Sequence, residues 1–255
     1  MPRTRCVLSF LVLIFGLAVN PVAWATPLDL SPIIRDFVSP ADASARIRRM
    51  ASSLAIADDR RALFAQVYSL TIEAADQQLS NHEFANPQWI TLLIVNYANL
   101  YRRTLLSELT GQRSKLPAGW QLEFDYSDLR IGWAPELDLI YGINVHIARD
   151  LVEALLVTPT RYNDQGLHRD FLLITEALKR AMPSIWIVAM KDRHQLPLAD
   201  RIVQSMVMHW IGKLRRDAWD RASAAATKDW PAYLIRLDAY LAQRAHWFGL
   251  LLPLI

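Results

Sequence analysis

The segment from Pro135 to about Leu156 restricts the fold more than any other part of the sequence. Its apolar residues would cover much of the circumference of a helix instead of a single stripe. Only neighbouring helices on several sides can bury such a surface, so we expect a central helix at 135–156 within an all-α, single-domain helical bundle. The apolar positions are Leu137, Leu139, Ile140, Ile143, Val145, Ile147, Leu151 and Leu155.

Prolines and glycines mark helix ends elsewhere in the chain. Ser39 precedes Pro40, an order typical of a capping residue followed by the first helical position, and Asn86-Pro87 is expected to open a further helix. Gly111 is placed to end the helix that begins at Pro87. We expect about seven helices, and we expect the apolar segment 184–190 to be helical, although alone it resembles a buried strand. The later helices are predicted at 165–182, 198–225 and 231–251.

Residues 1–25 have the three parts of a secretory signal. A basic start is followed by the apolar run Cys6–Val19 and by the small-x-small exit Ala23-Trp24-Ala25. We expect cleavage near Ala25, which leaves residues 26–255 as a single secreted or periplasmic domain. The alternative is an uncleaved membrane anchor, although the apolar run is shorter than the roughly 20 residues that a spanning helix needs.

Composition narrows the chemistry of the mature chain. Cys6 is the only cysteine, so cleavage leaves no thiol and no disulfide. Arg3 and Arg5 are also removed, so 26 basic and 25 acidic residues remain, and this balance disfavours a nucleic-acid partner. The apolar C-terminal stretch 247–255 is too short to cross a bilayer. We expect it to pack on the domain, and the alternative is contact with a membrane or a partner.

The most suggestive polar residues lie on the predicted central helix. His146 and Asp150 are four residues apart, so they project from the same helical face. A carboxylate in that position can orient an imidazole, or both groups can bind one metal ion. Asn144 lies about 200° around the helix from His146, so it serves a different neighbour.

The same residues carry a resemblance to a known family. The run Gly142–Leu151 resembles a Gly-x-Asn-x-His-x-x-x-Asp-Leu core that recurs in an uncharacterised family of helical bacterial proteins, and Asp170-Phe171 is similar to a later Asp-aromatic pair of that family. Thr175 stands where the family pattern has Asn. The resemblance covers roughly residues 40–225, and it implies a helical fold without implying an activity, a substrate or a cofactor. Its other elements are Asp59, Leu63-Phe64, Val67-Tyr68, Thr71, Phe84–Trp89 and Asn99–Tyr101.

Three hypotheses for the polar cluster remain open. In the first, His146, Asp150, Asn144 and Asp170 form a structural polar network between helices, since buried polar groups need partners. In the second, His146 and Asp150 form a general-base site or hold a divalent metal for hydrolysis, with Asp170 and His168 completing the site. The sequence itself requires no cofactor, and it lacks a second motif that would complete a metal site.

The third hypothesis is a carrier of a small apolar molecule or a lipid. Helical bundles can hold apolar ligands between their helices, and methionine and tryptophan side chains are well suited to line such a space. The basic run Lys213-Leu214-Arg215-Arg216 is expected on a solvated helix face, with Arg215 or Arg216 reaching inward as the alternative. The methionines available for a lining are Met182, Met190, Met206 and Met208.

Overall fold

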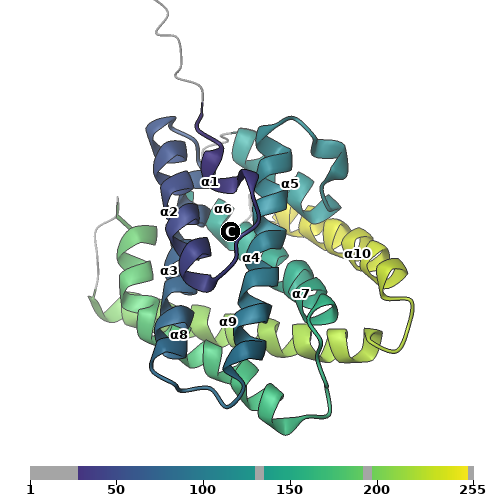
Figure 1. Ribbon diagram of the computed structural model, residues 1–255. Helices are drawn as coiled ribbons and strands as arrows, with labels where there is room; N and C mark the ends of the chain where they lie inside the picture. The colour runs from purple at the N-terminus through teal and green to yellow at the C-terminus, as the bar shows by residue number, and fades with distance from the viewer. Residues whose placement is uncertain (1–27, 130–134, 192–196, 252–255) are drawn as a thin grey trace, which may run out of the picture.

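A computed structural model shows an all-α bundle (Figure 1). It describes the backbone of residues 28–129, 135–191 and 197–251 and the side chains of 28–125, 138–191 and 200–243, and these parts contain helices without any β-strand. The expected fold class is therefore confirmed. The α-helices are α1 Ser31–Ile34, α2 Pro40–Ile56, α3 Arg61–Ser80, α4 Pro87–Leu109, α5 Ala118–Leu129, α6 Pro135–Val145, α7 Leu151–Val157, α8 Gln165–Ala189, α9 Pro197–Ala225 and α10 Trp230–Leu251.

Local signals explain several helix ends. The Ser39 side chain accepts a hydrogen bond from the Asp42 backbone N–H at 3.1 Å, and Pro40 occupies the first turn of α2. The Asp42 carboxylate reaches back to the backbone N–H of Val38 at 3.1 Å, which satisfies a second donor at this end. Gly111 follows α4 with a φ of 72°, a conformation that glycine adopts without the steric cost other residues would meet.

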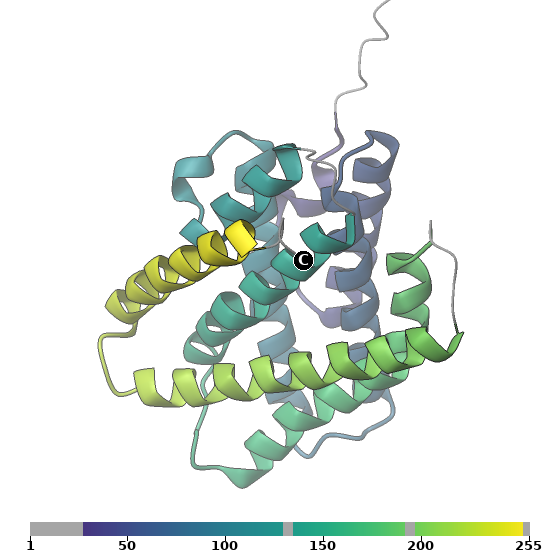
Figure 2. The same cartoon turned by 180° about the vertical axis from the view of Figure 1, so that it is seen from behind.

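The predicted central helix is present, but it is not a regular α-helix throughout. α6 and α7 are joined by a π-helical turn at His146–Asp150, so the helix runs from Pro135 to Val157 with one wider turn in its middle. The turn contacts α4, α9 and α10, which places it inside the bundle. Figure 2 shows this helix passing diagonally between α9 and α10. The expected segment 135–156 is thus correct in extent and wrong in assuming uniform α geometry.

Helix α8 continues beyond its predicted end. It was expected to stop near Met182, yet it passes through Pro183 and ends at Ala189. Proline removes one backbone hydrogen bond from a helix interior. The buried side chains of Ile185 and Ala189 make continuation favourable, because both pack into the core. The segment 184–190, which on its own resembles a strand, is therefore helical up to Ala189.

Two arginines hold the segment before α2 against the bundle. Arg46 donates to the carbonyl oxygen of Pro32 at 2.8 Å, and Arg102 donates to that of Ile33 at 2.9 Å and pairs with Asp36.

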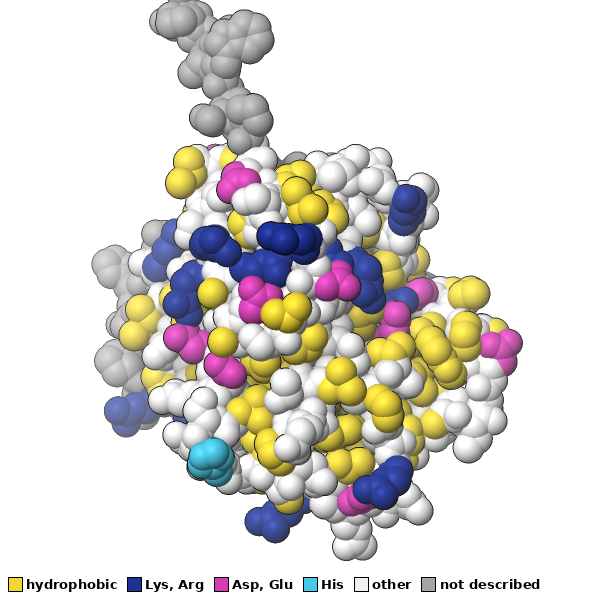
Figure 3. Space-filling view, in the orientation of Figure 1, with side chains coloured by type: hydrophobic (Ala, Val, Ile, Leu, Met, Phe, Trp, Pro, Cys, Tyr) yellow, Lys and Arg dark blue, Asp and Glu magenta, His cyan; other side chains and the backbone are white. Residues whose placement is uncertain are grey.

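On the face drawn in Figure 3, Lys and Arg side chains gather in a band with Asp and Glu side chains beside them. The charges of this face are therefore of both signs.

Two sequence predictions concern residues that the structure does not describe. The secretory signal at 1–25 lies outside the described ranges, and so do the side chains of the apolar stretch 247–255. Within the described chain, no helix is both long enough and apolar enough to span a membrane.

Gly142 supplies a test of the packing around the central helix. A Cβ atom at this position would lie 2.6 Å from Cδ2 of Phe64, whereas a Cβ at Gly212 in α9 would meet its nearest atom, in Arg216, at 3.5 Å. We expect Gly142→Ala to lower the free energy of unfolding by about 1–3 kcal/mol through overpacking. Gly212→Ala should raise it by about 0.5–1 kcal/mol through helix propensity.

Urea denaturation of both variants makes this comparison. The loss in Gly142→Ala should shrink when Phe64→Leu is added, because the double variant removes the clashing ring. Equal stabilities of Gly142→Ala and Gly212→Ala would contradict this packing.

Candidate functional site

The π-helical turn carries both residues of the predicted pair. The backbone N–H of Leu151 donates to the carbonyl oxygen of His146, five residues earlier, which is the hydrogen bond of a π turn. The side chains of His146 and Asp150 are 4% and 1% exposed, and Nδ1 of the imidazole lies 2.9 Å from Oδ2 of the carboxylate. Single π turns within α-helices are frequent at functional sites. His146 and Asp150 are therefore in contact, as their spacing predicted, and the contact lies on the π turn of the helix.

Asp150 collects donors from three directions. Besides His146, Nε1–H of Trp120 in α5 donates to Oδ2 at 2.8 Å, and the Arg149 guanidinium donates to Oδ1 at 3.2 Å. Arg149 extends the network, because its Nε donates to Asp238 of α10 at 3.0 Å and its Nη1 pairs with Glu153. The carboxylate thus holds α5 to the central helix, and Arg149 adds α10.

Burial and charge set the protonation states in this network. Burial lowers the pKa of His146 and outweighs the hydrogen bond and charge of Asp150, which raise it. For Arg149 the three carboxylates outweigh burial, so its pKa is raised and it stays charged. His146 is therefore neutral near pH 7. Its proton belongs on Nδ1, where it donates to Asp150, and Nε2 then carries a lone pair.

Aromatic rings enclose the imidazole. The ring of Tyr97 stacks on it with centroids 3.8 Å apart and planes 8° apart, and the ring of Tyr68 meets it edge-on at 4.5 Å. Phe64 makes a further edge contact at 5.8 Å. Burial raises the pKa of Tyr68 and of Tyr97 well above the usual value, so both remain neutral phenols. These rings hold the imidazole in one orientation.

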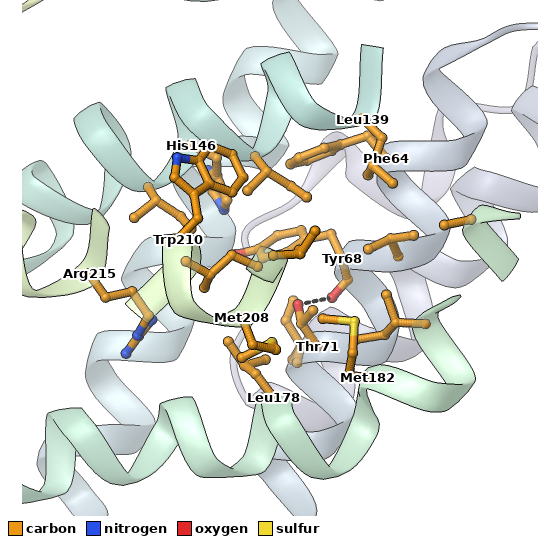
Figure 4. Close-up of a pocket in the computed structure, with 18 of the residues that line it drawn as sticks. Phe64, Tyr68, Thr71, Leu139, His146, Leu178, Met182, Met208, Trp210 and Arg215 are labelled. Carbon is orange, nitrogen blue, oxygen red and sulfur yellow. Dashed lines mark hydrogen bonds between the residues drawn. The ribbon is translucent and has the colours of Figure 1, made fainter. Parts of the chain in front are cut away.

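A cavity of about 210 Å³ lies next to this cluster. Side chains of α3, α4, α8 and α9 and of the central helix line it, and almost all of them are apolar. Ile140 and Val203, which also line it, are 45% and 42% exposed, so the cavity reaches the surface between α6 and α9. In the view of Figure 4, Tyr68 lies between Trp210 and His146 on one side and Met208 and Leu178 on the other.

Three polar atoms among the residues that line the cavity lack a partner. Oη of Tyr68, Nε2 of His146 and Nε1 of Trp186 are buried, and none makes a hydrogen bond within the described chain. A buried polar atom without a partner costs about 1–3 kcal/mol. Two donors and one acceptor without partners thus belong to residues that line a mostly apolar space.

The methionines predicted to line a cavity divide between two environments. Met182 and Met208 are buried and Met190 is half-buried, and all three line the cavity. Met206 is 66% exposed and does not belong to the lining. Flexible thioether side chains allow a cavity wall to adapt to different shapes.

The other predicted site residues lie away from His146. The carboxylate of Asp170 accepts hydrogen bonds from the backbone N–H groups of Ala85 and Asn86, at 3.1 and 2.6 Å, on the connection between α3 and α4. His168 packs against Trp219 with ring centroids 4.8 Å apart. Asn144 is half-buried, and its side chain makes no hydrogen bond with any described residue. The structure therefore brings His146 and Asp150 together and leaves these three outside their cluster.

Arg215 is buried, so the inward alternative for the basic run holds for this residue and the favoured solvated face does not. It is 5% exposed and belongs to the cavity lining. A signal for this was present, because Met208, Ile211, Arg215 and Ala218 follow one helical stripe of α9 whose other members are buried. Arg216, its neighbour, is exposed as expected.

Metal binding would need ligands beyond this pair. Among the described residues, no group of three or more His, Cys, Asp or Glu side chains is placed to hold a metal ion. Nδ1 of His146 faces Asp150, which leaves Nε2 as the ring nitrogen for any further partner. This arrangement suits a hydrogen-bond acceptor or a general base.

The fold and the site define an all-α protein with an internal apolar cavity beside a buried His–Asp pair. Residues 41–251 match a family described as a family of unknown function (DUF5995). The match covers most of the chain, so the chain belongs to this family, and the resemblance to an uncharacterised helical family is confirmed. Neither the curated proteins nor the solved structures contain a match to this chain.

Asp150 can be tested against a neighbouring carboxylate. Replacing Asp150 by alanine leaves the buried donors of His146 and Trp120 and one donor of Arg149 without their acceptor. We expect this variant to lose about 3–5 kcal/mol of unfolding free energy. Glu153→Ala should lose about 1 kcal/mol or less, since Arg149 keeps two other carboxylates. Urea denaturation measures both, and equal losses would show that Asp150 has no special structural role.

The lowered pKa of His146 predicts how stability changes with pH. Below the ordinary histidine pKa of about 6.5, the unfolded chain binds a proton that the folded protein does not bind. The free energy of unfolding that the neutral His146 contributes is therefore fully present above about pH 6.5. Below that pH it falls by up to about 1.4 kcal/mol for each pH unit. We expect His146→Gln to lack this part of the pH dependence between pH 7.5 and 5.5. A wild type that gains stability relative to this variant on acidification would mean that His146 forms a charged pair with Asp150.

Proposed function

We propose that the protein binds a compact, mainly apolar molecule in the cavity between α3, α4, α6, α8 and α9. The observation that carries the proposal is a cavity of about 210 Å³ with apolar walls and three buried polar atoms that lack partners in the described chain. An engineered apolar cavity of about 150 Å³ is already large enough to bind benzene. A single ring or a short alkyl chain therefore matches the available space.

The polar atoms give such a ligand an orientation. Ligand pockets are mostly apolar, with a few polar groups that fix the position of the molecule. A hydroxyl group on the ligand could donate to Nε2 of His146 and accept from Oη of Tyr68, two atoms that lack a partner within the described chain. These two hydrogen bonds would remove part of the free-energy cost of burying Nε2 and Oη without partners.

In this proposal the Asp150 network serves two purposes. Its hydrogen bonds with Trp120 and Arg149 hold the helices together, as the hypothesis of a structural network requires. Its hydrogen bond with His146 fixes the tautomer that presents a lone pair on Nε2. The predicted secretory signal at 1–25 supports a location outside the cytoplasm for this binding, and that location is part of the proposal.

The same pair supports a second candidate function, general-base catalysis. A neutral imidazole held by a carboxylate can accept a proton at Nε2, and the carboxylate then stabilises the imidazolium that forms. The observation that favours this candidate is the 2.9 Å contact between Nδ1 of His146 and Asp150, with the ring of Tyr97 stacked on the imidazole. A bound molecule recovered unchanged supports carriage, and a conversion that is lost in His146→Gln supports catalysis.

Calorimetric titration with 1-hexanol, 1-heptanol and 1-octanol tests the binding proposal. We expect saturable one-to-one binding, with affinity rising about fourfold for each added CH₂ until the cavity is full. Ala75 lines the cavity and is 3% exposed, so Ala75→Leu fills part of the space. This variant should bind 1-octanol at least about tenfold more weakly.

The matched control is Ala55→Leu, which adds the same side chain at an exposed position of α2. It should bind 1-octanol as the wild type does. The proposal would be overturned if none of the three alcohols bound saturably. It would also be overturned if Ala75→Leu and Ala55→Leu bound 1-octanol with equal affinity.

A further inference from the structure

Arg215 is a buried cation in the cavity wall whose described partners are all neutral. Its Nε donates to Oγ1 of Thr175 at 3.2 Å, and its Nη2 donates to the carbonyl oxygen of Phe171 at 3.1 Å. Its Cζ also lies 4.5 Å from the centre of the Phe171 ring. Within the described chain, no carboxylate pairs with this guanidinium, and Nη1 makes no hydrogen bond.

Other arginines of the bundle interior are paired with carboxylates. Arg102 pairs with Asp36, and Arg149 is within 3.2 Å of Asp150 and 3.0 Å of Asp238. Burial of a charge without a counter-ion is costly, because the lost hydration is not replaced by an opposite charge. Arg215 is therefore the exception among these side chains, and it is the one that lines the cavity.

The positive charge of Arg215 persists at neutral pH. Burial lowers its pKa to about 10, and the neighbouring Tyr97 acts in the opposite direction. A pKa of this size still leaves the guanidinium protonated near pH 7. His146, by contrast, is held neutral in the folded protein, because burial lowers its pKa. Arg215 is thus the residue of the cavity lining that carries a full positive charge.

We infer that the molecule bound in the cavity carries a single carboxylate, which pairs with Arg215 while its alkyl or aryl part occupies the apolar space. This inference rests on the proposed function, because it names the class of the bound molecule. A guanidinium has donors in a planar fork that matches the two oxygens of a carboxylate. Nη1 and the second N–H of Nη2 supply the donors that the described chain leaves unused.

The charge balance favours a carboxylate over a phosphate ester. One carboxylate brings a single negative charge, which the single charge of Arg215 neutralises. A phosphate monoester near pH 7 carries about −1.5 to −2, so part of its charge would stay uncompensated within an apolar cavity. The structure therefore assigns a monocarboxylic acid with a short apolar tail as the ligand class.

Matched ligands separate this inference from the binding proposal. Calorimetric titrations of the wild type at pH 8 would use octanoate, 1-octanol and octyl phosphate, which share the same chain. We expect octanoate to bind at least about tenfold more tightly than 1-octanol and more tightly than octyl phosphate. Binding of 1-octanol reports on the cavity, and the ratio of octanoate to 1-octanol affinity reports on the charge.

Arg215→Gln removes the charge and keeps a side chain that can donate to Thr175 or Phe171. This variant should bind octanoate and 1-octanol with affinities within about threefold of each other, while Arg215→Lys should retain part of the preference for octanoate. Arg216→Gln, at the exposed neighbouring position, is the control and should keep the full preference.

The wild-type titrations decide the inference even where a variant does not fold. Equal wild-type affinities for octanoate and 1-octanol, or tighter binding of octyl phosphate, would overturn it while leaving the cavity proposal intact. A preference that survives in a folded Arg215→Gln protein would also overturn the role of Arg215. Absence of binding by all three ligands would overturn the proposed function itself.

Discussion

The carboxylate of Asp150 is the interaction on which the interior of this bundle depends. It accepts hydrogen bonds from a tryptophan of α5, a histidine one turn earlier and the adjacent arginine, at distances between 2.8 and 3.2 Å. A carboxylate that is 1% exposed is tolerable only because these donors replace its hydration. The same contacts fix the imidazole of His146, so the network that holds the helices together also sets the chemistry at the edge of the cavity.

The cavity owes its shape to residues from distant parts of the chain. Elements of the family resemblance on α3, such as Phe64, Tyr68 and Thr71, face the cavity together with His146 on the central helix and Arg215 on α9. Gly142 lets the central helix approach the ring of Phe64 closely. Asp170 acts elsewhere, where it fixes the connection between α3 and α4.

Much of the fold follows from local sequence, and the site follows only in part. The cap at Ser39, the proline in the first turn of α4 and the apolar segment around His146 determine where helices lie, because these signals act within a few residues. The spacing of His146 and Asp150 predicted their pairing for the same reason. The π turn and the hydrogen-bond partners of Arg215 and Asp170 depend on how helices pack against one another. Contacts of that kind join residues far apart in the chain, and one sequence does not specify them.

The tautomer of His146 links the structural network to the proposed binding site, and nitrogen-15 NMR of the imidazole measures it directly. At pH 7 the folded protein should show a protonated Nδ1, as required by the hydrogen bond to Asp150, and an unprotonated Nε2. Asp150→Asn, in samples that remain folded, should loosen this preference. A proton on Nε2, or a doubly protonated imidazolium at pH 7, would contradict the central claim that Asp150 holds a neutral histidine with its lone pair available to a ligand.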